Sequence, residues 1–131
     1  VTGAGIINGK PIIMLPGYFM SALAGFCLYV VPLVNLMLGR EANWGLPVVE
    51  AKLERTARGK HGLERFQLLE VSRLGNSYLA TPIEAQFGSL MHISRANAYA
   101  IIPKGKTLRK GRHVTATLLA ASEFRRMQIQ K

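Results

Sequence analysis

The chain has 131 residues, 17 basic and 7 acidic side chains, a formal net charge of +10 and 49% hydrophobic residues. This composition is typical of a folded chain and excludes the disordered and collagen-like classes. All the acidic residues are glutamates, and the absence of aspartate excludes aspartic dyads, Ser-His-Asp triads and Asp-built magnesium sites within the chain.

Cysteine and histidine usage indicates neither disulfides nor a metal site. Cys27 is the single cysteine, and His61, His92 and His113 lie too far apart in sequence for the paired spacing of a zinc site. We therefore expect no metal bound by this chain and a reducing, cytoplasmic location. The chain begins at Val1 without an export-signal pattern, so we expect a cut-out or processed part of a longer protein.

The first third of the chain is almost uncharged, since residues 1–39 carry only Lys10. Two short apolar runs, Gly5–Ile7 and Pro11–Leu15, flank the dipeptide Asn8-Gly9. Asn and Gly both tolerate the positive φ of a tight turn, so this pattern predicts a β-hairpin.

A long apolar helix is predicted from about Phe19 to Leu38, ending at Gly39-Arg40. It is apolar on every side and is long enough to cross a bilayer, so it is either a buried core helix or a membrane span. The residues that weaken the membrane interpretation are Ser21, Gly25, Pro32 and Asn35, and we expect no membrane partner.

The remainder of the chain has the pattern of a small β domain. Its last strand places Val114, Ala116 and Leu118 on one face, and Leu90 and Ile93 have helical spacing. The predicted segments are strands at 46–57, 65–74, 77–83, 98–102 and 113–120, a helical stretch at 89–96, a turn at 103–105 and a frayed tail at 123–131.

Two ordered segments resemble the molybdopterin molybdotransferases of the MoeA and gephyrin E-domain type. Residues 8–23, NGKPIIMLPGYFMSAL, are similar to the family's G-K-P-[IV]-x-x-L-P-G-[NY]-P-V-S-A-L, and Pro32 matches a family proline. Residues 88–114 are similar to S-G-x-x-x-S-L-x-x-A-N-x-x-x-x-L-P-x-G followed by L-x-x-G-x-x-V. Together the two segments span most of residues 3–120.

The resemblance implies a mainly β chain with a small β-barrel-like (β-clip) domain. A β-hairpin and an apolar helix from the end of an α/β three-layer domain would precede that barrel. Residues 1–44 would be the incomplete edge of the α/β molybdopterin-binding domain, residues 46–120 the C-terminal β domain, and residues 121–131 a tail.

The resemblance also implies an activity for the complete protein. It would insert molybdate, or tungstate, into adenylylated molybdopterin and release AMP, with magnesium as a further requirement. The family's catalytic Asp lies in an upstream G-G-x-S-x-G-D segment that this chain lacks, so we expect the chain alone to bind no cofactor and to be inactive.

Pro16, Gly17, Tyr18 and Ser21 form the first candidate substrate-binding group. The free N–H groups and the dipole of a helix start favour an anion such as molybdate or a pterin phosphate, and Gly17 permits close approach. The alternative is a plain strand-to-helix connection with Ser21 capping the first turn. Phe19 stands where the family has proline.

Arg65 is the second candidate, because it lies in a segment similar to the family's G-R-x-x-[FY]-x-R, whose arginines face the oxyanion. Leu63 and Leu68 occupy the two arginine positions, so Arg65 either substitutes for them or is a solvated surface arginine. At the family's serine positions the chain has Phe87 and His92. Asn97 keeps the family's Ala-Asn pair, and we expect it to end the helix in a left-handed conformation.

Basic side chains are concentrated in two stretches. One contains Arg55, Arg58 and Lys60, and the other contains Lys104, Lys106, Arg109, Lys110 and Arg112, with Arg125 and Arg126 beyond. Such charge attracts polyanions, but no aromatic residues are interleaved for base stacking, so nucleic acid is not the favoured partner. A solvated charged face is the alternative.

The sequence is compatible with three functions. The first is the molybdotransferase, acting as a homodimer, since one hairpin and one all-round apolar helix cannot form a core by themselves. The second is a non-enzymatic relative that serves as a binding or scaffold module. The third is a basic nucleic-acid-binding domain.

Overall fold

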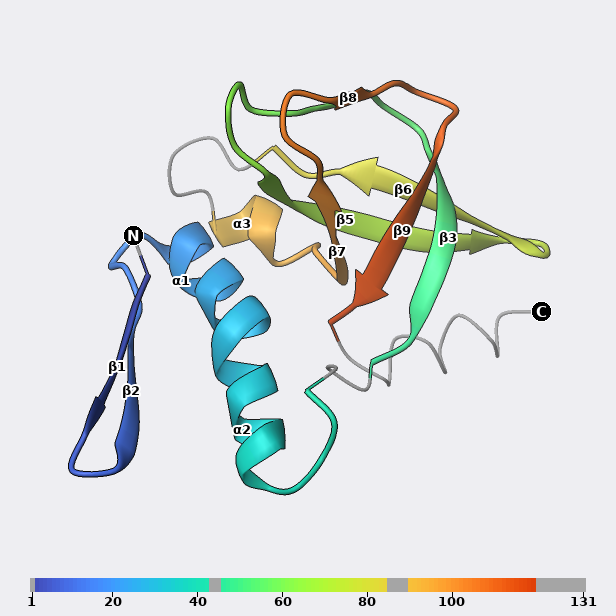
Figure 1. Ribbon diagram of the computed structural model, residues 1–131. Helices are drawn as coiled ribbons and strands as arrows, with labels where there is room; N and C mark the ends of the chain where they lie inside the picture. Colours follow the sequence, from blue (N-terminus) through green and yellow to red (C-terminus); the bar gives the residue numbers. More distant parts are fainter. Residues whose placement is uncertain (1, 43–45, 85–89, 120–131) are drawn as a thin grey trace. The chain divides into compact units, whose positions relative to one another are not determined.

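The predicted N-terminal hairpin is present in the computed structural model, which describes residues 2–42, 46–84 and 90–119 (Figure 1). Strands β1 (Gly3–Ile7) and β2 (Lys10–Met14) pair antiparallel around a two-residue turn. Asn8 and Gly9 have φ values of 50° and 74°, the left-handed values that such a turn requires. The Asn-Gly prediction is confirmed.

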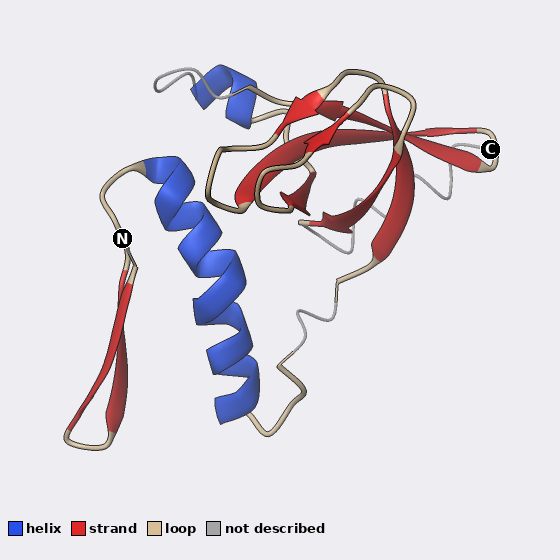
Figure 2. Ribbon diagram, turned by 45° about the horizontal axis from the view of Figure 1, so that its top comes forward, coloured by secondary structure: helices blue, strands red, loops and turns tan. Residues whose placement is uncertain are grey.

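One apolar helix follows the hairpin and runs without a break in Figure 2. It consists of α1 (Phe19–Gly25), a π-helical segment η1 (Phe26–Val30) and α2 (Val31–Met37). The helix ends before Gly39, whose φ of 70° is the left-handed conformation that commonly terminates helices. Both predicted ends of the helix are confirmed to within a residue.

The π-helical segment was not predicted, and Pro32 accounts for it. The N–H of Val31 donates to the carbonyl of Phe26, five residues back rather than four. A proline inside a helix has no N–H to donate, and its ring crowds the preceding turn. A wider π turn just before Pro32 relieves that crowding while the helix continues.

The helix passes the length and composition test for a membrane span. Phe19–Met37 is 19 residues long, and few of its residues are buried inside the described structure. A core helix of a soluble protein passes the same test. Length and hydropathy therefore do not distinguish a membrane span from a core helix. The class of protein to which the helix belongs is the further information needed.

Cys27 is buried in this helix, with 2% of its surface exposed. Burial disfavours the thiolate and raises the pKa of the Cys27 thiol from 9.0 to about 11. We expect the native thiol to resist an aromatic disulfide reagent at neutral pH and to react fast in denaturant. The folded protein holds the thiol proton more tightly than the unfolded chain, because the pKa is higher in the folded state. The contribution of this proton to the free energy of unfolding is therefore complete below pH 9 and is lost as the pH rises towards about 11. An ultraviolet titration of thiolate absorbance checks the pKa, and a native titration at 9.0 would contradict it.

The described residues from Leu46 onwards form the second compact unit of the chain, separate from the unit that contains the hairpin and the helix. Five strands close into a barrel in the order β3-β6-β5-β7-β9, with β3 paired to β9. The β3–β6 pair is parallel and the other pairs are antiparallel. The barrel strands are β3 (Val48–Leu53), β5 (Arg65–Leu74), β6 (Ser77–Pro82), β7 (Ala98–Ile102) and β9 (His113–Leu118).

The barrel is filled by alternate residues of each strand. In β9 the inward residues are Val114, Ala116 and Leu118, as the alternation predicted. Large and small side chains share the interior because a five-stranded barrel is narrow. The alanines of this core are Ala51, Ala57, Ala80, Ala98, Ala100 and Ala116.

Two short strands, which were not predicted, lie at one end of the barrel. β4 (Ala57–Arg58) pairs antiparallel with β8 (Thr107–Leu108), and β8 lies at the top of the barrel in Figure 1. Ala57 belongs to the core, and Leu108 packs against it. The predicted strand at 46–57 is therefore two strands, since β3 ends at Leu53.

The predicted fold class is confirmed: a mainly β chain with a small closed barrel, preceded by a hairpin and an apolar helix. The helical stretch predicted at 89–96 corresponds to α3 (Leu90–Ile93). The turn at 103–105 is present, with the N–H of Lys106 donating to the carbonyl of Pro103 at 3.1 Å. The predicted tail lies outside the described residues.

Candidate functional site

The first candidate site is the turn that joins β2 to α1, and it lies in the first compact unit. Tyr18 is the N-cap residue of the helix, with extended backbone at φ −75° and ψ 121°. Its carbonyl accepts the N–H of Ala22 at 2.9 Å, which closes the first helical turn. Leu15 packs close to Gly25, where an added Cβ would come within 2.8 Å of the Leu15 side chain. This contact fixes the turn against the helix.

This helix start is open to an anion. No side chain caps it, and no acidic residue lies in its first turn. Gly17, Tyr18 and Ser21 are exposed, Pro16 is half-buried, and a Cβ on Gly17 would meet no atom within 4 Å. Uncapped first-turn N–H groups and the helix dipole both favour a negatively charged ligand there.

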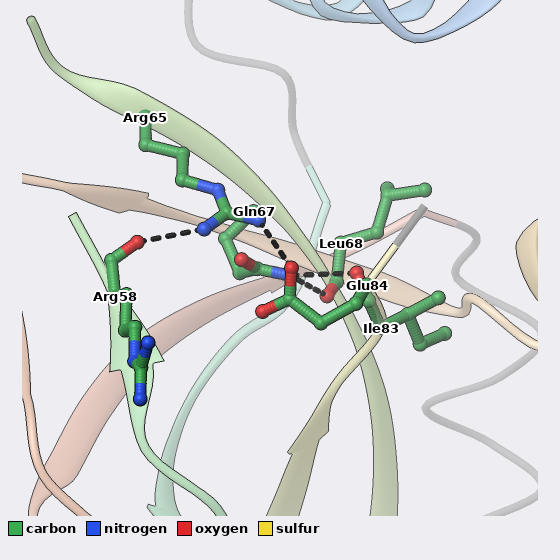
Figure 3. Close-up of polar contacts among 6 residues, drawn as sticks. All are labelled: Arg58, Arg65, Gln67, Leu68, Ile83 and Glu84. Atoms are coloured by element: carbon green, nitrogen blue, oxygen red, sulfur yellow. Dashed lines mark hydrogen bonds and ion pairs between the residues drawn. The ribbon is translucent and has the colours of Figure 1, made fainter. Parts of the chain in front are cut away.

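Arg65 lies in the second unit, at the start of β5, and its partners are in Figure 3. Its Nη1 donates to the carbonyl of Arg58 at 2.7 Å, and its Nη2 forms an ion pair with Glu84 Oε2 at 2.8 Å. The side chain is 29% exposed. The guanidinium therefore holds β4 against β5 and has a carboxylate partner. The alternative expectation, that Arg65 is a solvated surface arginine, is wrong.

Gln67 is a buried polar residue beside Arg65 on β5, and no sequence motif marks it. Its Nε2 donates to the carbonyls of Leu68 and Ile83, each at 2.9 Å. Its Oε1 has no hydrogen-bond partner within the described residues, and in Figure 3 it points away from those two carbonyls. A buried unpaired amide oxygen is a defined polar site inside an otherwise apolar barrel.

The two leucines at the family's arginine positions differ in their environment. Leu68 is fully buried, whereas Leu63 is 58% exposed. Phe66, between them, stacks its ring on Tyr99 with centroids 4.7 Å apart. Phe87 lies outside the described residues, and for His92 only the backbone position in α3 is described.

The expectation that Asn97 is left-handed is wrong. Among the described non-glycine residues only Asn8 has positive φ. The Asn97 Oδ1 instead accepts the N–H of Val71 at 2.7 Å, and its Nδ2 donates to the carbonyl of Val71 at 2.8 Å. Because β7 begins only at Ala98, the side-chain amide takes the place of the missing strand residue opposite Val71. It therefore extends the β5–β7 ladder by one pair.

The described residues contain no ready-made cluster of metal-ligating side chains. Within residues 2–42, 46–84 and 90–119 there is no group of three or more His, Cys, Asp or Glu side chains that could hold a metal ion. Magnesium prefers carboxylate oxygens, and the chain has no aspartate.

The chain is similar to solved structures of molybdopterin and molybdenum cofactor biosynthesis proteins. A molybdopterin biosynthesis MoeA protein from Pyrococcus horikoshii has 34% identity and a TM-score of 0.71, over 91% of this chain and 29% of that one. A second such structure, from P. horikoshii OT3, has 28% identity and a TM-score of 0.64, over 78% and 26% of the two chains. A molybdenum cofactor biosynthesis protein from Pyrococcus furiosus shares the fold, with 23% identity and a TM-score of 0.66 over 81% and 38%.

Residues 50–119, more than half of the chain, match the MoeA C-terminal region (domain IV). The chain therefore belongs to the MoeA C-terminal region family. It spans between 26% and 38% of the length of the solved structures described above. None of the curated proteins matches it significantly.

The structure brings Pro16, Gly17, Tyr18 and Ser21 together at one helix start, and it gives Arg65 two partners within the barrel unit. Sequence reasoning missed Glu84 and the side-chain amides of Gln67 and Asn97. For Glu84 and Gln67 no sequence signal existed, because Glu84 pairs with Arg65 nineteen positions away and Gln67 donates to Ile83 sixteen positions away, as well as to its neighbour Leu68. For Asn97, its position just before a predicted strand was the available signal.

Proposed function

We propose that this chain is the C-terminal part of a molybdenum or tungsten cofactor biosynthesis protein, which inserts molybdate into adenylylated molybdopterin and releases AMP. The match of residues 50–119 to the MoeA C-terminal region carries this proposal. The likeness over 91% of the chain to an archaeal MoeA protein supports extending it to the hairpin and helix. Residues 1–44 are then the edge of an α/β molybdopterin-binding domain, and residues 46–120 are the domain beside it.

The strand-to-helix turn is the substrate-binding element contributed by the first unit. Molybdate and the phosphate of molybdopterin are both anions, and the uncapped first turn of α1 offers N–H donors with no carboxylate to repel them. Gly17 has open space around its Cα, so the ligand can approach the backbone there. Pro16 and Tyr18 hold the turn, and the exposed Ser21 hydroxyl adds a further donor.

Arg65 is the oxyanion contact contributed by the second unit. Two of its five N–H donors bind Arg58 and Glu84, which leaves three for an oxyanion. Glu84 holds the guanidinium in place, but it also competes electrostatically with an incoming anion.

A pair of variants in the full-length protein tests this role of Arg65. We expect Arg65→Gln to weaken molybdate binding by about tenfold, the loss of one charge-assisted contact. We expect Glu84→Gln to strengthen it severalfold, because the competing carboxylate is removed while the amide still accepts a hydrogen bond. Isothermal titration with molybdate measures both. Equal molybdate affinity in both variants would make Arg65 a purely structural residue.

The non-enzymatic alternative is separated from the enzyme by titrating the full-length protein with molybdate and adenylylated molybdopterin while AMP release is followed. Binding of both with release of AMP supports the molybdotransferase. Absence of both binding and release would overturn it and leave the scaffold module.

We also propose that the protein is a cytoplasmic homodimer. Large apolar side chains are exposed on the hairpin and the helix, with Ile6 at 76%, Met14 at 64% and Met37 at 64%. In this proposal a partner surface or the rest of a longer chain covers them, and the helix lies in a protein interior rather than in a membrane. Light scattering of the full-length protein tests the dimer, and a monomer at all concentrations would contradict it.

A further inference from the structure

The short β4–β8 pair joins two basic stretches that are nearly fifty residues apart in sequence into one surface. Arg58 lies directly opposite Thr107, and the N–H of Lys110 donates to the Thr56 hydroxyl at 3.2 Å. The basic surface is defined here by its eight Lys and Arg side chains: Arg55, Arg58, Lys60, Lys104, Lys106, Arg109, Lys110 and Arg112. All eight side chains are exposed.

The Lys and Arg side chains of the basic surface take no part in the ion pairs Arg65–Glu84 and Arg95–Glu70. None of the chain's glutamates lies within residues 55–63 or 103–113. Glu50 and Glu54 accept hydrogen bonds from threonine hydroxyls on the barrel strands. Arg55 shares a hollow with Glu70 and Glu84, and Lys110 shares another with Glu54. The other six cations line no hollow with a glutamate among the described residues, so most of the positive charge of the surface faces solvent.

The basic surface is held by the barrel core and not merely by a loose loop. Ala57 and Leu108 face the core, so their neighbours Arg58 and Thr107 face outward. The backbones of the two stretches approach so closely that a Cβ on Gly59 would lie 1.9 Å from the carbonyl oxygen of Lys106. A hollow of about 650 Å³ is lined by residues 106–110 and Arg112, which include four of the eight basic side chains.

We propose that the basic surface binds the phosphate backbone of double-stranded nucleic acid without reading its sequence. Protein–protein interfaces favour aromatic side chains and are depleted in lysine, whereas this surface contains four exposed lysines and no aromatic residue. Single strands are bound chiefly by stacking bases on the rings of Phe, Tyr and Trp, and residues 55–63 and 103–113 contain none of these three residue types. The rings in these two ranges are the imidazoles of His61 and His113. Backbone contacts to a duplex need only Lys and Arg.

The test is equilibrium binding of the full chain to a random-sequence DNA duplex at several salt concentrations between about 0.05 and 0.2 M. We expect affinity to fall steeply, with a log–log slope of about −4 to −7 for four to eight phosphate contacts. The double variant Lys106→Gln with Arg109→Gln is expected to reduce the slope by about two units and to bind at least about tenfold more weakly at low salt.

The matched control is Lys10→Gln with Arg40→Gln, which removes the same net charge from exposed positions in the other unit. The control is expected to bind nearly as well as the unaltered chain. Equal losses in the two double variants would overturn the proposal, because net charge alone would then explain binding. Tighter binding to polyglutamate or to a single strand than to the duplex at the same salt would overturn it as well. AMP release enters none of these measurements, so the outcome is independent of the proposed function.

Discussion

Replacing Asn97 with alanine is expected to lower the free energy of unfolding of the barrel by about 2–4 kcal/mol. The Asn97 amide bonds both the N–H and the carbonyl of Val71, a residue that is only 2% exposed. Alanine leaves both backbone groups buried without a partner, and each orphan costs about 1–3 kcal/mol. Denaturant unfolding measures the loss. The matched control is Asn76→Ala at an exposed position after Gly75, where we expect a change within about 0.5 kcal/mol.

The variant Asn97→Asp distinguishes the hydrogen bonds from packing. An ionised carboxylate still accepts the Val71 N–H but repels the Val71 carbonyl, to which the amide donated. The protonated acid can donate again, so the deficit relative to the unaltered chain should shrink as the pH falls. A deficit that is independent of pH would contradict this account of Asn97.

Replacing Gly59 with alanine is expected to destabilise the barrel by about 2–3 kcal/mol through overpacking. A Cβ at this position would lie 1.9 Å from the oxygen and 3.0 Å from the carbon of the Lys106 carbonyl. The obstacle is backbone, so it cannot rotate away like a side chain. The β4–β8 pair must separate, and this also divides the basic surface, so duplex binding is expected to fall with stability. Thermal unfolding and the duplex titration are the two measurements.

The control for Gly59 is Gly5→Ala, because a Cβ on Gly5 meets no atom within 4 Å. Gly5 has ordinary backbone angles, so alanine there is expected to be neutral or slightly stabilising through the unfolded chain. A Gly59→Ala protein as stable as the unaltered chain would show that the two stretches are not held together as described.

Local pattern was sufficient for most of the elements of this chain. Asn8-Gly9 predicted the hairpin, and the alternation in 113–118 predicted which side chains fill the barrel. Both depend on neighbours in sequence, namely the φ of a turn residue and the two-residue period of a strand. The turn before Phe19 was also predicted from local pattern, because a predicted strand, a Pro-Gly pair and a predicted helix follow one another in the sequence.

Contacts between distant residues were outside the reach of that reasoning. The family resemblance made Arg65 a candidate, but only the fold paired it with Glu84, nineteen positions away. The Ala-Asn sequence is compatible both with the end of a helix and with the extension of a sheet. The register of β5 against β7 places Asn97 beside Val71, so that its side chain extends the sheet. The π turn before Pro32 was also not predicted. It relieves the steric crowding that a proline ring causes when the helix continues through it.

By itself, the sequence determined the order of elements, the faces of the strands and the family resemblance, because each is encoded in residues that are close along the chain. Only the tertiary structure decided which Lys and Arg side chains form ion pairs and which lie next to one another on the surface. Arg65 and Arg95 form ion pairs with Glu84 and Glu70, while the β4–β8 pair brings two basic stretches that are distant in sequence side by side. Electrostatic interaction depends on distance in space, and strand pairing sets that distance.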